Sequence, residues 1–164
     1  MEVEKLNLSV GQWVELIKAD ESSPIPVWFH VVSSSMYPFI RANKDKVMLL
    51  HVKPEDLKAG DIVLFPVNNT NGEYCLHRIY RIEGDMVRTM GDANRGPDDW
   101  IAKNDILGKA VMIRRGNNTI DCEEPKWVRR FRWWNRFWRI RPIMLLPFRI
   151  VGKCKRVWRK VFDK

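Results

Sequence analysis

The segment Y-C-L-H-R-I-Y-R-I-E-G-D-M-V-R-T-M, residues 74–90, indicates the fold class of this chain. Within residues 74–82 the side chains alternate with a period of two, which is typical of a β-strand. Glu83-Gly84-Asp85 is a turn sequence, and residues 86–90 predict the returning strand of a hairpin. His77 shares a strand face with Cys75 and Ile79, and we expect this face to point toward the core or a cleft.

Similar short strands extend from this hairpin in both directions. β-branched and aromatic residues, separated by turns rich in Gly, Asn and Asp, predict strands at residues 27–32, 47–52, 62–67 and 106–114. A loop of Asn, Thr and Gly at residues 68–72 leads into the strand at 74–82. Residues 7–19 predict a short amphipathic helix. The pattern therefore predicts a mainly β body over residues 1–124.

The basic charge of the chain lies in its last 40 residues. Residues 1–124 hold 15 Lys and Arg against 19 Asp and Glu, a net charge of −4. Residues 125–164 hold 14 against one, a net charge of +13. The body is therefore mildly acidic, and the excess positive charge of the whole chain belongs to a C-terminal tail, residues 125–164.

Aromatic side chains recur in this tail at helical spacing, opposite arginines, at Trp127, Phe131, Trp134 and Trp138. After an apolar break at residues 142–148, the same stripe continues with Val151, Trp158 and Phe162. Basic, Trp-rich amphipathic helices bind anionic membrane surfaces, so we expect the stripe to bind a membrane or a partner. Packing of the stripe on the β body is the alternative, and nucleic acid is the partner least favoured.

Cysteine usage and the N-terminus bear on the compartment. Cys75, Cys122 and Cys154 are an odd number without metal-ligand spacing, which favours a reducing compartment without disulfides or a metal site. The N-terminus lacks the apolar core of a secretory leader. The longest uncharged run, residues 22–40, contains three prolines and does not predict a spanning helix. We therefore expect a cytoplasmic, peripherally membrane-associated protein that needs no cofactor.

Three short motifs supply the side chains of a hydroxyl-based protease. Ser35 follows a predicted strand, His77 lies on another, and Asp98 and Asp99 end a loop rich in Gly, Asp and Asn. A serine hydroxyl is a poor nucleophile until a base such as histidine takes its proton, and a carboxylate then orients the ring. Taken one at a time, these residues are better explained by a serine-rich turn and a core histidine, and the loop by Asx side chains that cap their own backbone.

In this order, over about residues 25–116, the motifs resemble the clan of type I signal peptidases and SOS-repressor-type autoproteases. The Ser-x-Ser-Met-x-Pro box of the clan matches residues 33–38. This match implies that Ser35 is the nucleophile, that Ser33 and the Ser35 N–H stabilise the oxyanion, and that Met36 contributes to substrate binding. The segment 76–79, Leu-His-Arg-Ile, is similar to the histidine branch of endoplasmic-reticulum-type and archaeal-type signal peptidases, so His77 replaces the lysine base of most bacterial members.

The same branch carries a Gly-Asp-(Asn/Ala)-Asn box followed by a pair of aspartates. The resemblance therefore implies that Gly91, Asp92 and Asn94 organise a loop, and that Asp98 or Asp99 is the acid of the triad. It also implies a signal-peptidase and LexA-like fold, and a serine endopeptidase that cleaves extended leader-type peptides after small residues. No segment of the sequence predicts the spanning helix that such peptidases carry. A catalytically silent peptide- or lipid-binding module of the same fold is the alternative function.

Overall fold

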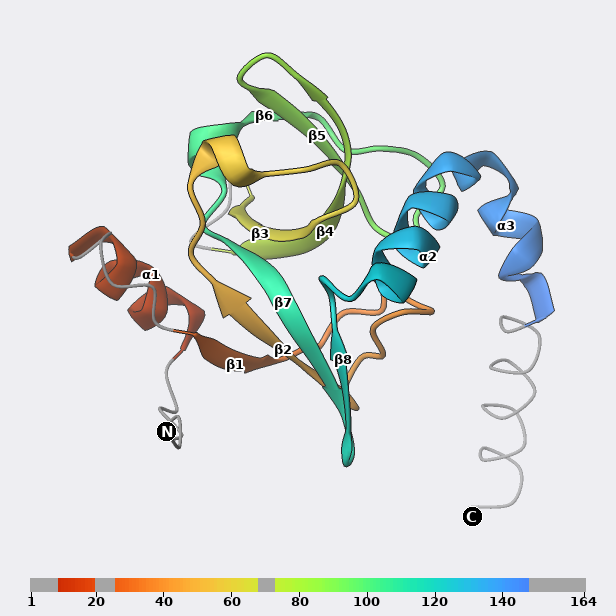
Figure 1. Cartoon of the computed structure of the whole chain (residues 1–164), viewed down its shortest axis with the longest axis horizontal. Coiled ribbons are helices and arrows are strands. Elements are labelled where there is room, and N and C mark those ends of the chain that lie inside the picture. Colours follow the sequence, from red (N-terminus) through yellow and green to blue (C-terminus); the bar gives the residue numbers. More distant parts are fainter. Residues whose placement is uncertain (1–8, 20–25, 68–72, 148–164) are drawn as a thin grey trace.

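A computed structural model describes residues 9–19, 26–67 and 73–147 of the chain. Its strands are β1 Val27–His30, β2 Asp45–Leu50, β3 Ile62–Pro66, β4 Tyr74–Glu83, β5 Met86–Met90, β6 Trp100–Ala102, β7 Gly108–Arg115 and β8 Asn118–Asp121 (Figure 1). Its helices are α1 Val10–Ala19, α2 Pro125–Arg136 and α3 Arg141–Met144, with 3₁₀ turns η1 Pro54–Asp56, η2 Lys103–Asp105 and η3 Trp138–Ile140. The prediction of a mainly β body is confirmed.

The strands form one curled antiparallel sheet in the order β1-β2-β7-β3-β4-β5-β6. One edge of β7 has two partners in succession, because β3 pairs with Gly108 and Lys109 whereas β8 pairs with Met112–Arg115. The sheet therefore divides into two lobes, with β1, β2, β7 and β8 in one and β3 to β6 in the other (Figure 1).

Two hydrophobic clusters fill the space inside the lobes, and β3 contributes to both. Its alternate residues Ile62 and Leu64 join the first cluster, which also holds Trp13 of α1. Val63 and Phe65 join the second, which β4, β5 and β6 complete with Ile79, Val87 and Ile101. A strand covered on both faces reads as a continuous apolar run, which explains the sequence Ile-Val-Leu-Phe.

The predicted hairpin is present, with Glu83 of β4 opposite Met86 of β5. Cys75 and Ile79 face the second cluster, and the buried ring of His77 lies edge-on to Phe65, so the predicted inward face of β4 is confirmed. The short strands β6 and β8 were not predicted. They are three and four residues long, and most of their residues are polar or only partly buried.

Helix α1 begins at Val10, inside the predicted range 7–19. Ser9 and Gln12 cap it reciprocally, since the Gln12 N–H donates to Ser9 Oγ at 3.2 Å and the Ser9 N–H donates to Gln12 Oε1 at 2.9 Å. Residues 7–8 and the predicted loop 68–72 lie outside the described residues.

The predicted aromatic stripe of the tail packs on the body instead of facing outward. Phe131 and Trp134 are only 4% and 5% exposed, Trp127 packs against the first cluster, and the ring of Trp138 lies 5.9 Å from that of Tyr80. Phe131 and Trp134 therefore pack on the body in this conformation, as in the alternative. Trp127 and Trp138 are half-buried, and membrane binding by the stripe stays a prediction. Burial of indole and phenyl area against an apolar core drives this choice.

The predicted break at residues 142–148 also differs. Pro142 lies in the first turn of α3, where its missing N–H leaves no hydrogen bond unmade, so it begins a helix. The continuation of the stripe at Val151, Trp158 and Phe162 lies outside the described residues. Among the helices of the described ranges, none has the length and apolarity needed to cross a bilayer.

Candidate active site

Ser35 lies just beyond the end of β1, where the chain leaves the sheet. The Val31 N–H still donates to the Asp45 carbonyl at 3.2 Å, and a helical turn then begins with the Tyr37 N–H donating to the Ser34 carbonyl at 3.1 Å. Met36, the residue after Ser35, is 1% exposed and anchors this turn in the first cluster. Ser33 and Ser34 are consequently exposed, and Ser35 is half-buried at the surface.

Ser35 and His77 line the same cavity, which has a volume of about 410 Å³. Its other walls are mainly apolar and include Met36, Leu64 and Leu76, and none of the described residues that line it is a lysine. A second, more open hollow of about 510 Å³ also has Ser33 and Ser35 in its wall, together with Asn94 and Leu145. The nucleophile position therefore borders two depressions that can receive side chains of a bound chain.

His77 and Asp98 form a short contact, with His77 Nδ1 2.6 Å from Asp98 Oδ2. The Thr89 hydroxyl donates to the same carboxylate oxygen at 2.7 Å, and the Asp98 N–H donates to the Thr89 carbonyl at 2.8 Å. Arg88 Nε donates to the Asp98 carbonyl at 2.8 Å. Asp99 is exposed, so of the two aspartates predicted as alternatives the structure brings Asp98 to the histidine.

This pairing controls the protonation of His77. Burial lowers the pKa of the ring, but the hydrogen bond from the ring to Asp98, the neighbouring Cys75 and the charge of Asp98 raise it more, and the net pKa is about 9. With Nδ1–H donated to Asp98, Nε2 is the nitrogen free to accept a proton once the ring is neutral. The arrangement is that of a histidine base with an orienting carboxylate.

The hydroxyl of Ser33 donates to the hydroxyl of Ser35 in this structure. Ser33 Oγ lies 3.3 Å from Ser35 Oγ, and the Ser35 N–H donates to Ser33 Oγ at 3.3 Å. Within the described ranges Ser35 Oγ makes no hydrogen bond with the His77 ring. The two groups predicted to stabilise an oxyanion thus contact each other through long, weak hydrogen bonds that a substrate could replace.

The loop Gly91–Asn94 holds the backbone of Ser35 in place. The Ala93 N–H donates to the Ser35 carbonyl at 2.7 Å, and the Asn94 N–H donates to the Gly91 carbonyl at 3.1 Å. A Cβ on Gly91 would lie 2.9 Å from the Ser35 carbonyl oxygen and 2.8 Å from Asn94 Cγ. Glycine is therefore required for this close approach, in agreement with the loop-organising role expected of Gly91 and Asn94.

Asp92 organises the same loop from beneath through Arg78, the residue after the histidine. Arg78 Nε and Nη2 donate to the two carboxylate oxygens at 2.9 and 2.8 Å, and Nη1 donates to the Gly60 carbonyl at 2.7 Å. Both side chains are 0% exposed, and the guanidinium lies over the ring of Phe131 at 4.2 Å. This buried bidentate pair ties β4, the loop and α2 together.

Several supporting residues were not predicted from the sequence. Thr89 and Arg88 hold Asp98, as described above. Trp134 Nε1 donates to the Asp92 carbonyl at 3.3 Å, and Arg141 donates to the Trp134 carbonyl at 3.1 Å and to the Gly91 carbonyl at 3.3 Å. Burial lowers the pKa of Arg141 to about 10. The position of Thr89 just before the Gly-Asp box is a usable signal, whereas nothing in the sequence marks Arg141.

Two further sequence expectations concern the cysteines and a metal site. Cys75 and Cys122 are free thiols, and Cys154 lies outside the described residues. Among the described residues no group of His, Cys, Asp and Glu could hold a metal ion.

Comparisons of the chain with protein-family models, with curated proteins and with solved structures found no match.

Proposed function

We propose that this protein is a serine endopeptidase of the signal-peptidase clan, with Ser35 as nucleophile, His77 as base and Asp98 as the orienting acid. The observation that carries the proposal is the 2.6 Å contact between His77 Nδ1 and Asp98 Oδ2, made by a buried histidine that shares a cavity with Ser35. Among the described residues that line this cavity there is no lysine, which supports histidine as the base.

In the proposed mechanism neutral His77 accepts the Ser35 proton at Nε2 while Asp98 holds Nδ1–H. The serine oxygen attacks a peptide carbonyl, and the leaving amine takes the proton back from the imidazolium, giving an acyl-enzyme. Water, deprotonated by the same ring, then releases the acyl group and restores the serine. The Ser33 hydroxyl and the Ser35 N–H would turn from each other to the developing oxyanion, which stabilises the transition state by several kcal/mol, on the order of 3.

The proposed substrate is an extended leader-type peptide. Strand β1 pairs with β2 alone among the described strands, so its other edge is open next to the chain that leads to Ser35. A peptide added along this edge would direct alternate side chains to opposite faces. The apolar cavity beside Ser35 can accept one such side chain, and the preference for small residues comes from the resemblance alone.

A catalytically silent peptide-binding module is the second candidate function. The observation that favours it is the Ser35 hydroxyl, which accepts from the Ser33 hydroxyl and makes no hydrogen bond with His77 within the described residues. Catalytic hydrogen bonds are often long or misaligned in structures without substrate, so the same geometry is compatible with a peptidase.

Labelling with a fluorophosphonate probe distinguishes them. The wild type should react at Ser35, whereas Ser35→Ala and His77→Ala should not. Ser34→Ala is the matched control, because Ser34 is an exposed serine of the same turn, and it should label like the wild type. Labelling that persists in Ser35→Ala would refute the nucleophile, and a wild type that stays unlabelled up to pH 9 would favour the silent module.

A further inference from the structure

The outer side of the C-terminal helices carries a concentration of exposed apolar side chains. Of eight large hydrophobic residues exposed in the described part of the chain, five fall between positions 133 and 146: Trp133 48%, Phe137 39%, Ile140 43%, Ile143 72% and Leu146 53%. They recur every three or four residues, and the rings of Trp133 and Phe137 lie 5.0 Å apart. We call these five residues the outer ridge. A contiguous apolar surface on a soluble body is typical of a docking site.

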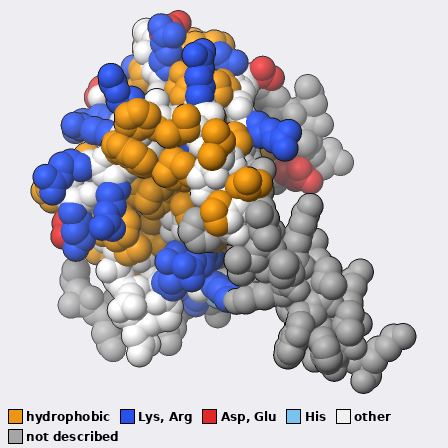
Figure 2. Space-filling view, turned by 90° about the vertical axis from the view of Figure 1, so that its right-hand side faces the viewer, with side chains coloured by type: hydrophobic (Ala, Val, Ile, Leu, Met, Phe, Trp, Pro, Cys, Tyr) orange, Lys and Arg blue, Asp and Glu red, His pale blue; other side chains and the backbone are white. Residues whose placement is uncertain are grey.

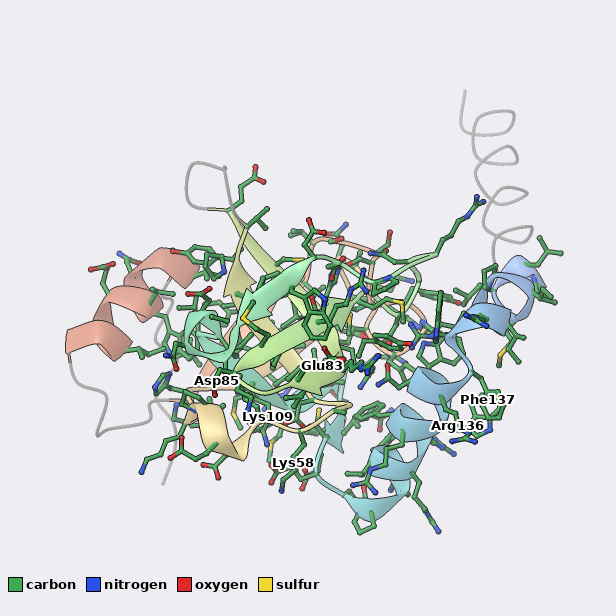
Figure 3. The ribbon with its side chains drawn as sticks, turned by 90° about the horizontal axis from the view of Figure 1, so that it is seen from above. Lys58, Glu83, Asp85, Lys109, Arg136 and Phe137 are labelled. Atoms are coloured by element: carbon green, nitrogen blue, oxygen red, sulfur yellow. The ribbon has the colours of Figure 1, made fainter. Side chains whose placement is uncertain are left out.

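Positive charge surrounds the outer ridge. Arg129, Arg132, Arg136 and Arg139 are exposed, and none forms a salt bridge with another described residue. Residues 125–147 contain seven Lys and Arg and no Asp or Glu. On the face that carries α2 and α3, hydrophobic side chains gather at the centre and Lys and Arg lie around them (Figure 2). Arg136 and Phe137 lie side by side, pointing away from the sheet (Figure 3).

We propose that the outer ridge and its arginines form a docking surface for an anionic lipid bilayer. Tryptophan and phenylalanine favour the headgroup level, aliphatic side chains favour the acyl boundary, and arginines on the rim attract anionic headgroups. A second copy of this chain fits less well, because a two-fold contact would bring arginines of the same rim together. Single-stranded nucleic acid fits less well because bases stack on rings, and Ile140, Ile143 and Leu146 offer none.

The docking surface adjoins the candidate active site. Leu145 immediately precedes the ridge residue Leu146. It lines the open hollow that also contains Ser33 and Ser35. A bilayer bound to the ridge therefore lies next to the hollow in which the nucleophile sits. This inference extends the proposed peptidase function by naming the surface at which it would act, and it is testable without catalysis.

Vesicle co-sedimentation of the full chain carrying Ser35→Ala tests the proposal, so that the result does not depend on peptidase activity. We expect sedimentation with phosphatidylcholine vesicles that contain phosphatidylglycerol. Binding to phosphatidylcholine alone should be at least tenfold weaker, roughly the difference that the attraction of two or more arginines to an anionic surface makes. Binding should fall as salt rises.

Two sets of variants locate the surface. Trp133→Ser with Phe137→Ser should weaken binding to the anionic vesicles by tenfold or more, roughly the loss of two buried apolar side chains. Arg132→Gln with Arg136→Gln should weaken it by about 10- to 30-fold. The matched control is Leu16→Ser with Met86→Ser, which removes two exposed apolar residues on α1 and β5 and should leave binding unchanged.

Three results would overturn the proposal. One is equal binding to the anionic and neutral vesicles, or none to either. Another is a dimer in lipid-free solution that Trp133→Ser with Phe137→Ser converts to a monomer, which would assign the ridge to a second copy of the chain. The third is an oligonucleotide that binds through the same residues while vesicles do not, which would assign the ridge to nucleic acid.

Discussion

Asp98→Asn should both slow the reaction of Ser35 and move its pH dependence. The pKa of His77 is raised from 6.5 to about 9, so at pH 7 roughly 1% of the rings are neutral. Each pKa unit corresponds to about 1.4 kcal/mol, and the surroundings of His77 therefore favour the imidazolium by about 3 kcal/mol. Without the carboxylate, burial dominates, and we expect the pKa of His77 to fall to 6.5 or below.

The orientation of the ring is lost together with the charge. An asparagine can donate to Nδ1 and so stabilise the wrong tautomer, which costs about 10⁴-fold at the plateau of the rate in hydroxyl proteases. The wild-type rate constant for fluorophosphonate labelling should rise about tenfold per pH unit from pH 6 and level off near 9. The variant should be nearly flat above pH 6.5, at a much lower plateau.

Labelling quenched at a series of times, from pH 5.5 to 10 in buffers of constant ionic strength, measures both the plateau rate and the pH midpoint. Asp99→Asn is the matched control, because Asp99 is the exposed neighbour that does not reach the ring, and it should follow the wild-type curve. The reasoning is refuted if Asp99→Asn loses as much rate as Asp98→Asn. It is also refuted if the midpoint of the Asp98→Asn curve stays near 9.

Three further predictions use stability as a readout. Because the pKa of His77 is raised in the folded state, its stabilisation is fully present below pH 6.5 and is lost as pH rises through about 9, so urea unfolding should show a loss of up to about 3 kcal/mol over this range. Asp92→Asn leaves a buried guanidinium uncompensated and should lower the free energy of unfolding by about 3–5 kcal/mol, whereas Glu83→Gln at an exposed pair should cost less than about 1. Gly91→Ala should cost about 1–3 kcal/mol and slow labelling of the nucleophile, whereas Gly96→Ala, with nothing within 4 Å of its new Cβ, should do neither.

Much of the body could be predicted from local patterns. Strands β3, β4 and β5 carry strong β-branched, aromatic or alternating sequences, and their observed limits differ from the predicted ones by at most one residue. The order of strands in the sheet could not be predicted, because β7 pairs with β2 and β3, which precede it by many residues. Such pairings depend on which strands contribute to each of the two hydrophobic clusters. These strands are far apart in the chain, so no short window of sequence contains that information.

In the candidate site, residue types were predictable and their partners were not. The motifs placed His77 on an inward strand face, but Asp98 and Asp99 were equivalent in the sequence. The structure separates them because the Asp98 N–H donates to the carbonyl of Thr89 in β5, which fixes which carboxylate turns inward. Arg78 belonged to the other strand face by alternation, and its burial depends on Asp92 and on the rings of α2, which are distant in sequence.

In the C-terminal helices the sequence pattern could not decide which aromatic face meets the body, and the reason is physical. Residues 127–138 carry two overlapping helical patterns, one through Phe131 and Trp134 and one through Trp133 and Phe137. Both satisfy the spacing of an apolar stripe, so periodicity cannot decide which one meets the body. Trp134 does so because its indole N–H donates to the Asp92 carbonyl, whereas the outer ring of Trp133 has no such partner among the described residues. The aromatic residues of the tail therefore form two sets. The inner set, Phe131 and Trp134, packs under the loop that holds Ser35, and the outer set, Trp133 and Phe137, is exposed among arginines.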